Sequence, residues 1–273
     1  MGKKILAYAM IASLIWGASF TITKIALNDI SPIMLAFLRY GTACLILLPF
    51  LFPFGIKIKN FILLGLFSVT IPTTLQNIGL KYTYAYISGF IQSTGPLYTL
   101  ILAYFFLKEK ITKQKIAGLV IATPATYFLI SPRGGGGLLG NLLVLLSAIS
   151  YSAGGIVAKN LLNNGYKAIQ ILSFSSFSGA IFLAPCLFLE ETKFNYESLP
   201  VVIFLALFAT IIAYILWYGA MEEIEVSKLS FFTYMMPVFS MIFSGIFLGE
   251  EIKIFTIFAG FVAITGILIA QKQ

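Results

Sequence analysis

One charged side chain lies well inside a long apolar stretch of this sequence and could bind a ligand there. Arg39 falls about six residues into its stretch, which is roughly 9 Å along a helix. Its planar guanidinium can donate paired hydrogen bonds to a carboxylate or a phosphate. We interpret Arg39 as a candidate anchor for a ligand anion. The alternative is a structural arginine that bonds helix-end carbonyls or extends its head group outward.

Neutral polar and aromatic side chains inside other apolar stretches supply further groups that could recognise a ligand. Asn77 and Gln92 are the strongest single candidates, because an amide that is buried without a partner is costly. Any one of the others could instead pack helices together or belong to an aromatic belt at a membrane surface. The candidate binding and cavity residues are Trp16, Arg39, Thr73, Gln76, Asn77, Gln92, Tyr98, Tyr151, Tyr214, Trp217 and Tyr234.

Two prolines near the middle of separate apolar stretches are candidate hinges. Pro96 and Pro237 lie in similar local sequences. A proline inside a helix removes one backbone hydrogen bond and bends the helix. Because paired helix breaks in matching parts of a membrane protein point to a moving binding site, we expect these prolines to act as hinges or to line a cavity. The alternative is that they are inert kinks.

The residue types that are missing from the apolar stretches exclude several kinds of chemistry. All ten acidic residues lie in loops or at the ends of the stretches, and the sequence has no histidine. A carrier of lipophilic cations, or a proton carrier, normally needs an acid within the membrane, and a membrane-embedded enzyme needs a nucleophile, a base or a metal cluster there. We therefore expect no catalytic residue, no metal site and no cofactor, and we interpret Cys44 and Cys186 as packing residues.

Composition indicates that helices crossing a membrane hold these side chains in place. Of the 273 residues, 59% are hydrophobic and 10% are charged, whereas soluble proteins carry about 25% charged residues. The mean hydropathy is +0.97. Ten apolar runs of the length that spans a membrane predict an all-α integral membrane protein with ten transmembrane helices. The predicted spans are 5–27, 33–54, 61–80, 84–106, 114–131, 138–160, 168–189, 200–220, 226–248 and 254–271.

The basic residues predict how the chain is oriented. The net charge of +8 comes from residues in short loops, which is typical of a topology signal rather than of a nucleic-acid-binding face. Of the 18 Lys and Arg residues, twelve fall on the side of the N-terminus and five on the other, while Arg39 lies within a span. We therefore predict a multi-pass protein of the cell membrane with both termini in the cytoplasm. We expect the first apolar run to be a retained helix rather than a signal peptide.

The two halves of the sequence resemble each other at both ends of each half. Near the start, Trp16 and Lys24 have the same spacing as Tyr151 and Lys159 and align with them. Near the end, Pro96 and Glu109 have the same spacing as Pro237 and Glu250 and align with them in turn. We interpret the paired lysines as residues that extend to the membrane surface. We interpret the paired glutamates as groups that cap the helices that follow them and order the loops, with coupling sites as the alternative.

An odd number of spans in each half has a consequence for symmetry. With five spans per half, the second half must enter the membrane from the side opposite to the first. We predict a first repeat at 1–132, a glycine linker at 133–137 and a second repeat at 138–273. Two inverted five-helix repeats place a substrate site near the middle of the membrane and allow it to open to either side.

At these residues the sequence resembles the EamA type of the drug/metabolite transporter superfamily, over essentially the whole chain. The second half departs from the first motif, since Tyr151 and Gly155 replace its Trp and Phe. The motifs that carry the resemblance are Trp16, Gly17 and Phe20; Arg39; Pro96, Leu107 and Glu109; and Pro237, Leu248 and Glu250. The resemblance implies a ten-helix carrier with a central cavity, in a family that commonly exports amino acids or other small metabolites.

Two functions fit the sequence. The first is a secondary transporter that moves small neutral or anionic metabolites, amino acids among them, by alternating access, with export as the expected direction. The alternative is a multidrug exporter of the same fold that selects bulky apolar compounds. Either function has a small-molecule substrate and the lipid bilayer as partners, and neither involves nucleic acid. We expect a monomer, because one chain supplies both repeats.

Overall fold

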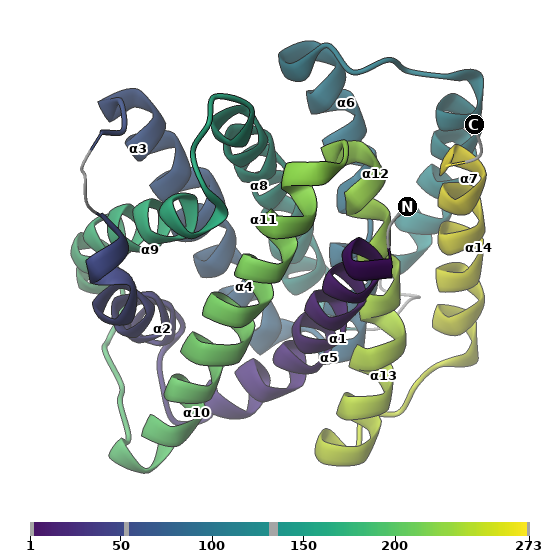
Figure 1. Ribbon diagram of the computed structural model, residues 1–273. Coiled ribbons are helices and arrows are strands. Elements are labelled where there is room, and N and C mark those ends of the chain that lie inside the picture. Colours follow the sequence, from purple (N-terminus) through teal and green to yellow (C-terminus); the bar gives the residue numbers. More distant parts are fainter. Residues whose placement is uncertain (1–2, 52–54, 131–135, 272–273) are drawn as a thin grey trace.

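The computed structural model describes residues 3–51, 55–130 and 136–271, nearly all of which are helical (Figure 1). Apolar runs of this length become helices because a helix satisfies every backbone polar group within its own segment. Among the described residues, eight helical stretches are long and apolar enough to cross a membrane. They are Lys4–Ala26, Pro32–Leu51, Ile58–Tyr82, Ala85–Leu107, Leu138–Asn163, Ala168–Leu189, Tyr196–Glu223 and Val226–Leu248.

The other two predicted spans also form helices, α7 (Lys113–Ile130) and α14 (Ile254–Gln271). They pack side by side at one edge of the bundle (Figure 1). Neither is among the eight stretches that meet the length and hydropathy of a span, so a ten-span topology stays a prediction. The predicted linker at 133–137 lies partly outside the described residues.

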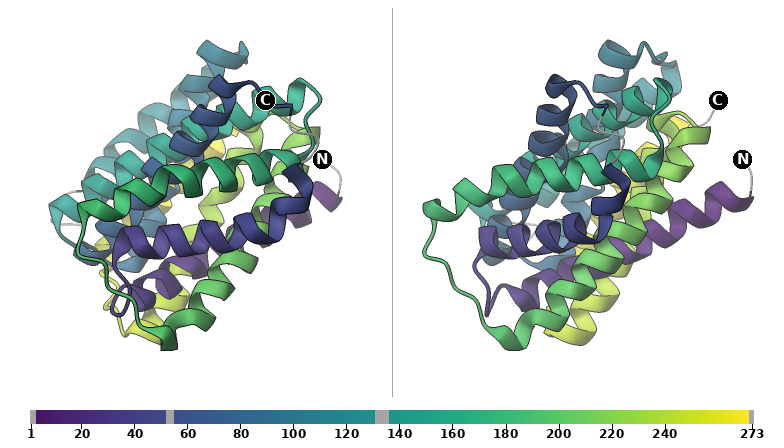
Figure 2. Two further views of the ribbon diagram at one scale, coloured as in Figure 1. Left: turned by 90° about the vertical axis from the view of Figure 1, so that its left-hand side faces the viewer. Right: turned by 60° about the vertical axis from the view of Figure 1, so that its left-hand side comes forward.

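Four of the eight stretches consist mainly of one long helix. They are α1 (Lys3–Ala26), α2 (Pro32–Leu47), α8 (Leu138–Asn163) and α9 (Ala168–Cys186). Short 3-10 turns, η1 (Leu48–Leu51) and η3 (Leu187–Leu189), extend α2 and α9. Figure 2 shows α2 and α9 lying side by side, far apart in sequence but packed against each other.

The other four stretches are interrupted helices. The third runs through α3 (Ile58–Leu64), the π-helical segment η2 (Gly65–Thr70) and α4 (Ile71–Tyr82), and the fourth consists of α5 (Ala85–Gln92) and α6 (Gly95–Leu107). The seventh runs through η4 (Tyr196–Ser198), α10 (Leu199–Phe204), the π-helical segment η5 (Leu205–Ile212) and α11 (Ala213–Glu223). The eighth consists of α12 (Val226–Ser230), the 3-10 segment η6 (Phe231–Tyr234) and α13 (Met235–Leu248).

The interruptions recur at matching positions in the two halves. The two π-helical segments begin at residues 65 and 205, and the second parts of the two broken helices begin at residues 95 and 235. Lys108 and Gly249 end α6 and α13 in the left-handed conformation, with φ of 58° and 61°. These pairs are separated along the chain by nearly the same interval as Pro96 and Pro237. The spacing of the sequence repeat therefore recurs in the backbone.

The structure changes the interpretation of the two prolines. Pro96 and Pro237 lie in the first turns of α6 and α13. In a first turn a proline is tolerated, since its missing N–H has no helical partner there. The helices are interrupted just before the prolines, at the turn of Ser93 and Thr94 and at η6. The prolines therefore begin new helices rather than kink continuous ones, and their role as hinges stays a prediction.

Contacts between loops define two faces of the bundle. On one face Ser31 N donates to Lys193 O at 3.0 Å. On the other, the Tyr166 hydroxyl donates to Gly55 O at 2.7 Å. We call the second the terminal face, because α1 begins there, and the first the opposite face. The terminal face holds residues 55–57, 108–112, 164–167 and 224–225, and the opposite face holds residues 27–31, 83–84, 136–137, 190–195 and 249–253.

Glycines let α4 and α8 approach closely near the opposite face. A Cβ added at Gly140 would lie 2.7 Å from the carbonyl oxygen of Gly79, 2.8 Å from the carbonyl carbon of Tyr82 and 3.0 Å from Thr83 N. All three atoms belong to the backbone, so relief requires the two helices to move apart. Small residues at helix crossings have this role in membranes, where close packing drives helix association.

Gly140→Ala is therefore expected to destabilise the protein. Overpacking a well-packed contact costs about 1–3 kcal/mol of folding free energy. The melting temperature of the detergent-purified protein should therefore fall. Loss of the monodisperse elution peak on heating measures it. Gly41→Ala is the matched control, since a Cβ there meets nothing within 4 Å. Equal melting of the two variants would contradict the close contact between α4 and α8.

Candidate functional site

A cavity of about 910 Å³, including the part that is open to the outside, lies among the interrupted helices. Its walls carry one charged side chain, that of Arg39, and none of the described lining residues is acidic. Aromatic side chains form much of the rest, namely Trp16, Phe20, Tyr151, Tyr214, Trp217 and Tyr218.

The cavity lies near the middle of the bundle and extends toward the terminal face along α11 and α12. Its lining includes Val226, the first residue of α12 on that face. Toward the opposite face the lining on α1 stops at Phe20 and on α4 at Gln76, each about six residues, or roughly 9 Å, before its helix ends. Along α1 and α4, about 9 Å of helix therefore lies between the cavity lining and the helix end at the opposite face.

The π-helical segment η5 positions the arginine. Arg39 Nη2 donates to Ala209 O at 3.0 Å, and its Nε donates to the hydroxyl of Thr210 at 2.6 Å. The indole of Trp16 donates to the same carbonyl, Ala209 O, at 3.0 Å. A π-helical turn makes carbonyls available to side chains, because it breaks the regular i to i−4 ladder. One oxygen of η5 thus fixes a side chain from α1 and another from α2.

Some N–H groups of Arg39 make no hydrogen bond to the described residues. Its side chain is buried, with 4% exposure, and Nη1 has no hydrogen-bond partner among the described residues. A guanidinium held at two of its nitrogens presents the remaining N–H groups in a fixed direction, which reduces the entropy lost when an anion binds. Both readings of Arg39 from the sequence therefore have a structural basis, since it bonds a helix carbonyl and also lines the cavity.

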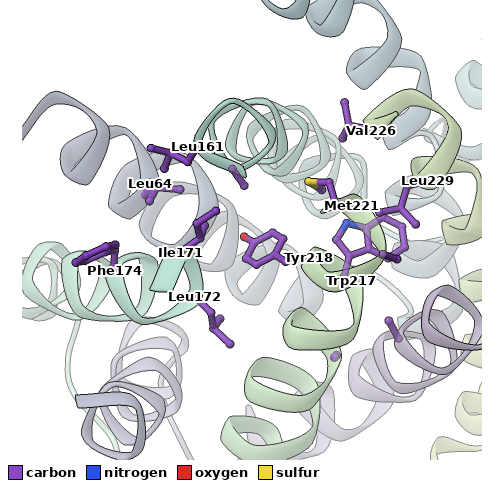
Figure 3. Close-up of a cluster of buried hydrophobic side chains, with 14 of the residues drawn as sticks. Leu64, Leu161, Ile171, Leu172, Phe174, Trp217, Tyr218, Met221, Val226 and Leu229 are labelled. Carbon is purple, nitrogen blue, oxygen red and sulfur yellow. The ribbon is translucent and has the colours of Figure 1, made fainter. Parts of the chain in front are cut away.

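The aromatic wall packs around Trp16. Its ring centroid lies 5.0 Å from that of Tyr214 and 5.1 Å from that of Trp217, both edge to face. Trp217, Tyr218 and Met221 on α11 also belong to a buried hydrophobic cluster that extends to α9 and α12 (Figure 3). Such packing holds the rings in place, so that they offer a rigid surface for the apolar part of a ligand.

An unpaired acceptor lines another part of the cavity. Gln92 Nε2 donates to Gln76 Oε1 at 3.1 Å and lies 3.3 Å from the Ser147 hydroxyl. Gln92 Oε1 is buried and has no partner among the described residues. Because buried acceptors are nearly always satisfied, this unpaired oxygen is a candidate partner for a donor group of a ligand. The Tyr151 hydroxyl, also in the wall, is 3.0 Å from the hydroxyl of Thr73.

Most residues that the sequence singled out meet at this cavity. Their role in binding stays a prediction, but the structure brings them together from α1, α2, α4, α5, α6, α8 and α11. Those that line the cavity are Trp16, Arg39, Gln76, Gln92, Pro96, Tyr151, Tyr214 and Trp217.

The other predicted residues lie outside the lining. Thr73 contacts it only through Tyr151. Asn77 points toward α2, where its Nδ2 donates to Pro32 O at 3.0 Å. The remaining three, which lie on α6, η6 and α13, are absent from the cavity wall, namely Tyr98, Tyr234 and Pro237.

Several lining residues were not singled out from the sequence. Ser152 donates to Gly95 O at 3.0 Å, at the interruption between α5 and α6. Met221 and Met236 add flexible apolar walls. Small and apolar residues of this kind are common in every span, so composition and spacing give no signal that separates these from packing residues.

Comparison with known proteins identifies the family. The sequence model of the EamA-like transporter family matches residues 3–131 and again residues 138–271. A protein of Archaeoglobus fulgidus, described as an uncharacterized transporter, is 28% identical over 265 residues, which cover 94% of this chain and 95% of the relative. A probable amino-acid metabolite efflux pump of Salmonella typhimurium is 24% identical, over 92% of this chain and 89% of the relative.

The fold is shared with a solved structure described as the crystal structure of a protein. The TM-score is 0.74 at 17% sequence identity, and the match covers 99% of this chain and 97% of that chain. The two family matches together span almost all of the sequence, and eight apolar helices give the described chain the character of a membrane protein. The chain therefore belongs to the EamA-like transporter family, as a multi-pass membrane transporter.

Proposed function

We propose that this transporter carries a small neutral or anionic metabolite, with amino acids as the leading candidates, by alternating access. The observation that carries the proposal is the charge of the cavity, whose described walls hold Arg39 and no acid. In a site of low dielectric, a lone cation favours a carboxylate and repels an ammonium group that has no carboxylate of its own. The aromatic wall suits the apolar part of such a substrate.

An amino acid would satisfy both polar sides of the cavity. Its carboxylate would pair with Arg39, and its ammonium group would donate to the unpaired oxygen of Gln92. The relative from Salmonella typhimurium that is named a probable amino-acid metabolite efflux pump supports this substrate class and export as the direction.

The same proposal includes the architecture that alternating access needs. The matched π-helical segments and broken helices support two inverted repeats of five helices each. The bias of basic residues supports cytoplasmic termini in a cell membrane, which makes the terminal face the cytoplasmic one. A monomer suffices for this mechanism, because the cavity lies within a single chain.

Counterflow in proteoliposomes tests the proposed function. Vesicles that contain the protein are loaded with a mixture of unlabelled amino acids, and each labelled amino acid is offered outside. We expect accumulation of a subset, with protein-free vesicles as the blank. No accumulation of any amino acid, phosphorylated metabolite or nucleoside would overturn the proposal.

The aromatic wall also favours a second candidate, a multidrug exporter of bulky apolar compounds. Trp16, Tyr214 and Trp217 pack into one apolar surface, which could bind flat drugs without help from a charge. Drug resistance on overexpression that Arg39→Ala leaves unchanged would support this function. Unchanged resistance over many compounds would count against it.

A further inference from the structure

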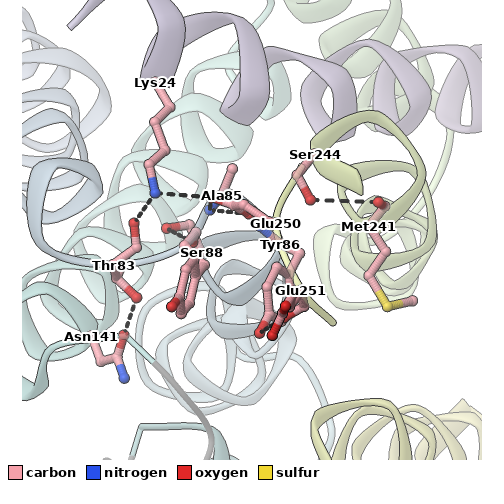
Figure 4. Close-up of polar contacts among 11 residues, drawn as sticks. Lys24, Thr83, Ala85, Tyr86, Ser88, Asn141, Met241, Ser244, Glu250 and Glu251 are labelled. Atoms are coloured by element: carbon pink, nitrogen blue, oxygen red, sulfur yellow. Dashed lines mark hydrogen bonds and ion pairs between the residues drawn. The ribbon is translucent and has the colours of Figure 1, made fainter. Parts of the chain in front are cut away.

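A partly buried ion pair joins the two halves of the chain at the opposite face (Figure 4). Lys24 Nζ at the end of α1 lies 2.8 Å from Glu250 Oε1 and donates to Thr83 O at 2.6 Å. The carboxylate of Glu250 also accepts Ala85 N at 2.9 Å and Tyr86 N at 3.3 Å, the first amides of α5. The sequence suggested that Lys24 extends to the membrane surface and that Glu250 caps α14, but the two residues instead bind each other and α5.

This ion pair lies between the opposite face and the residues of α1 and α5 that line the cavity. Glu250 is 5% exposed and Lys24 is 26% exposed. The cavity lining on α1 stops at Phe20, one turn of helix before Lys24, and the lining on α5 is Gln92, at the end of α5 away from Glu250. Because the pair joins the first half of the chain to the second, the two halves cannot separate at this face without breaking it.

The terminal face carries the equivalent residues in a different arrangement. Lys159, the counterpart of Lys24, donates to Met221 O at 2.7 Å and to Ile224 O at 3.0 Å. Glu109, the counterpart of Glu250, accepts a hydrogen bond from the Ser227 hydroxyl. The register that aligns the two glutamates also aligns Ile224 with Thr83 and Ser227 with Tyr86. Lys159 and Glu109 therefore contact the segments of the second half that correspond, in the repeat, to those that Lys24 and Glu250 contact in the first half.

Among the described residues, the ion pair has no equivalent at the terminal face. Within the part of the chain that the structure describes, no oxygen of Glu109 lies within 4.0 Å of Lys159 Nζ, and no backbone amide of α12 donates to Glu109. At this face the cavity lining reaches Met221 and Val226, beside the carbonyls that bind Lys159. Along α11 and α12 the cavity lining therefore reaches the face that has no such ion pair among its described residues.

We propose that Lys24–Glu250 and Lys159–Glu109 are two latches that close alternately, one at each face of the carrier. In the conformation described here the opposite-face latch is closed and the terminal-face latch is open. When the carrier changes over, Glu250 leaves the N-terminus of α5, and Glu109 moves from the Ser227 hydroxyl to Lys159. This inference rests on the proposed function, because it assigns the residues that hold each end of an alternating-access cycle.

Labelling of a cavity cysteine from each face tests the latches directly. Gly155→Cys is introduced after Cys44→Ala and Cys186→Ala, because Gly155 lines the cavity and a Cβ there meets nothing within 4 Å. A membrane-impermeant maleimide is applied to sealed vesicles of each orientation. The parent should react from the terminal face. Glu250→Gln should raise labelling from the opposite face by about tenfold or more. The variant loses the ion pair only in the conformation that is closed at this face, so the equilibrium shifts toward the conformation that is open there.

Neighbouring and equivalent glutamates supply the controls. Glu251→Gln should leave labelling unchanged, since Glu251 is exposed and its backbone carbonyl, not its carboxylate, accepts from Tyr86. Lys24→Met should repeat the effect of Glu250→Gln, and it remains informative if Glu250→Gln fails to fold. Adding Glu109→Gln should favour the terminal-face-open conformation again and reduce the opposite-face labelling.

Two results separate the latches from the transport function. Unchanged opposite-face labelling in both Glu250→Gln and Lys24→Met would overturn the latches, even if the parent shows counterflow. Failure of the parent to catalyse counterflow would count against the proposed substrate class, whereas the labelling would still report whether the ion pair holds the opposite face closed.

Discussion

Transport of an anionic or zwitterionic substrate is expected to fall roughly 10- to 100-fold when Arg39 is replaced with methionine. A fall of this size corresponds to the loss of one hydrogen bond between a charged group and the substrate in a site without water. Such a bond contributes about 1.5–3 kcal/mol to binding. Methionine keeps much of the apolar length of the side chain but has no donor for a carboxylate. Counterflow in proteoliposomes at matched protein density measures the loss.

The fold should survive this substitution. Ala209 O keeps its hydrogen bond from Trp16, and the Thr210 hydroxyl keeps its bond to Leu205 O at 3.2 Å. Arg39→Lys should recover part of the activity, because it restores the charge without the planar pair of donors. Equal counterflow of an anionic substrate by Arg39→Met and the parent protein would remove Arg39 from the binding site.

Gly155→Trp is expected to block transport almost completely, by more than about tenfold, without loss of folding. A Cβ at Gly155 meets nothing within 4 Å, and the residue lines the cavity, so an indole there occupies the space of a substrate. Binding of a labelled substrate to the purified protein should be lost together with counterflow, while the elution profile and melting temperature remain near those of the parent.

Gly41→Trp is the matched control. Gly41 is also half-buried in a helix and also meets nothing within 4 Å of an added Cβ, but it does not line the cavity. It should transport at nearly the parent rate. Comparable inhibition by both variants would mean that a large side chain anywhere in the bundle impairs transport. That result would contradict the assignment of the cavity as the substrate site.

The positions of the helices could be predicted from the sequence because their signal is local. An apolar run of about 20 residues between short polar loops has one stable outcome in a membrane. The predicted spans 168–189 and 226–248 coincide with the helical stretches that the structure shows. The π-helical segments were not predicted, since an extra residue in one turn changes neither composition nor periodicity and depends on what packs beside it.

The candidate site could be predicted only in part, because the rotation of each helix is a tertiary property. Gln76 and Asn77 are neighbours in sequence, and both amides are costly to bury. They lie about 100° apart around the helix, so Gln76 lines the cavity while Asn77 bonds Pro32 O. Similarly, the sequence pairs Lys24 with Lys159, but the partner of Lys24 lies 226 residues away and no local pattern reveals it.

The cap that Glu250 places on α5 also bears on how the protein is made. Ala85 N receives its acceptor from a residue 165 positions later in the chain. As the polypeptide is inserted into the membrane from its N-terminus, Ala85 N and Lys24 have no Glu250 to bind until the loop between α13 and α14 has been synthesised. The first half of the chain therefore cannot complete its fold alone. The native contacts at the opposite face form only when nearly all of the protein has been synthesised.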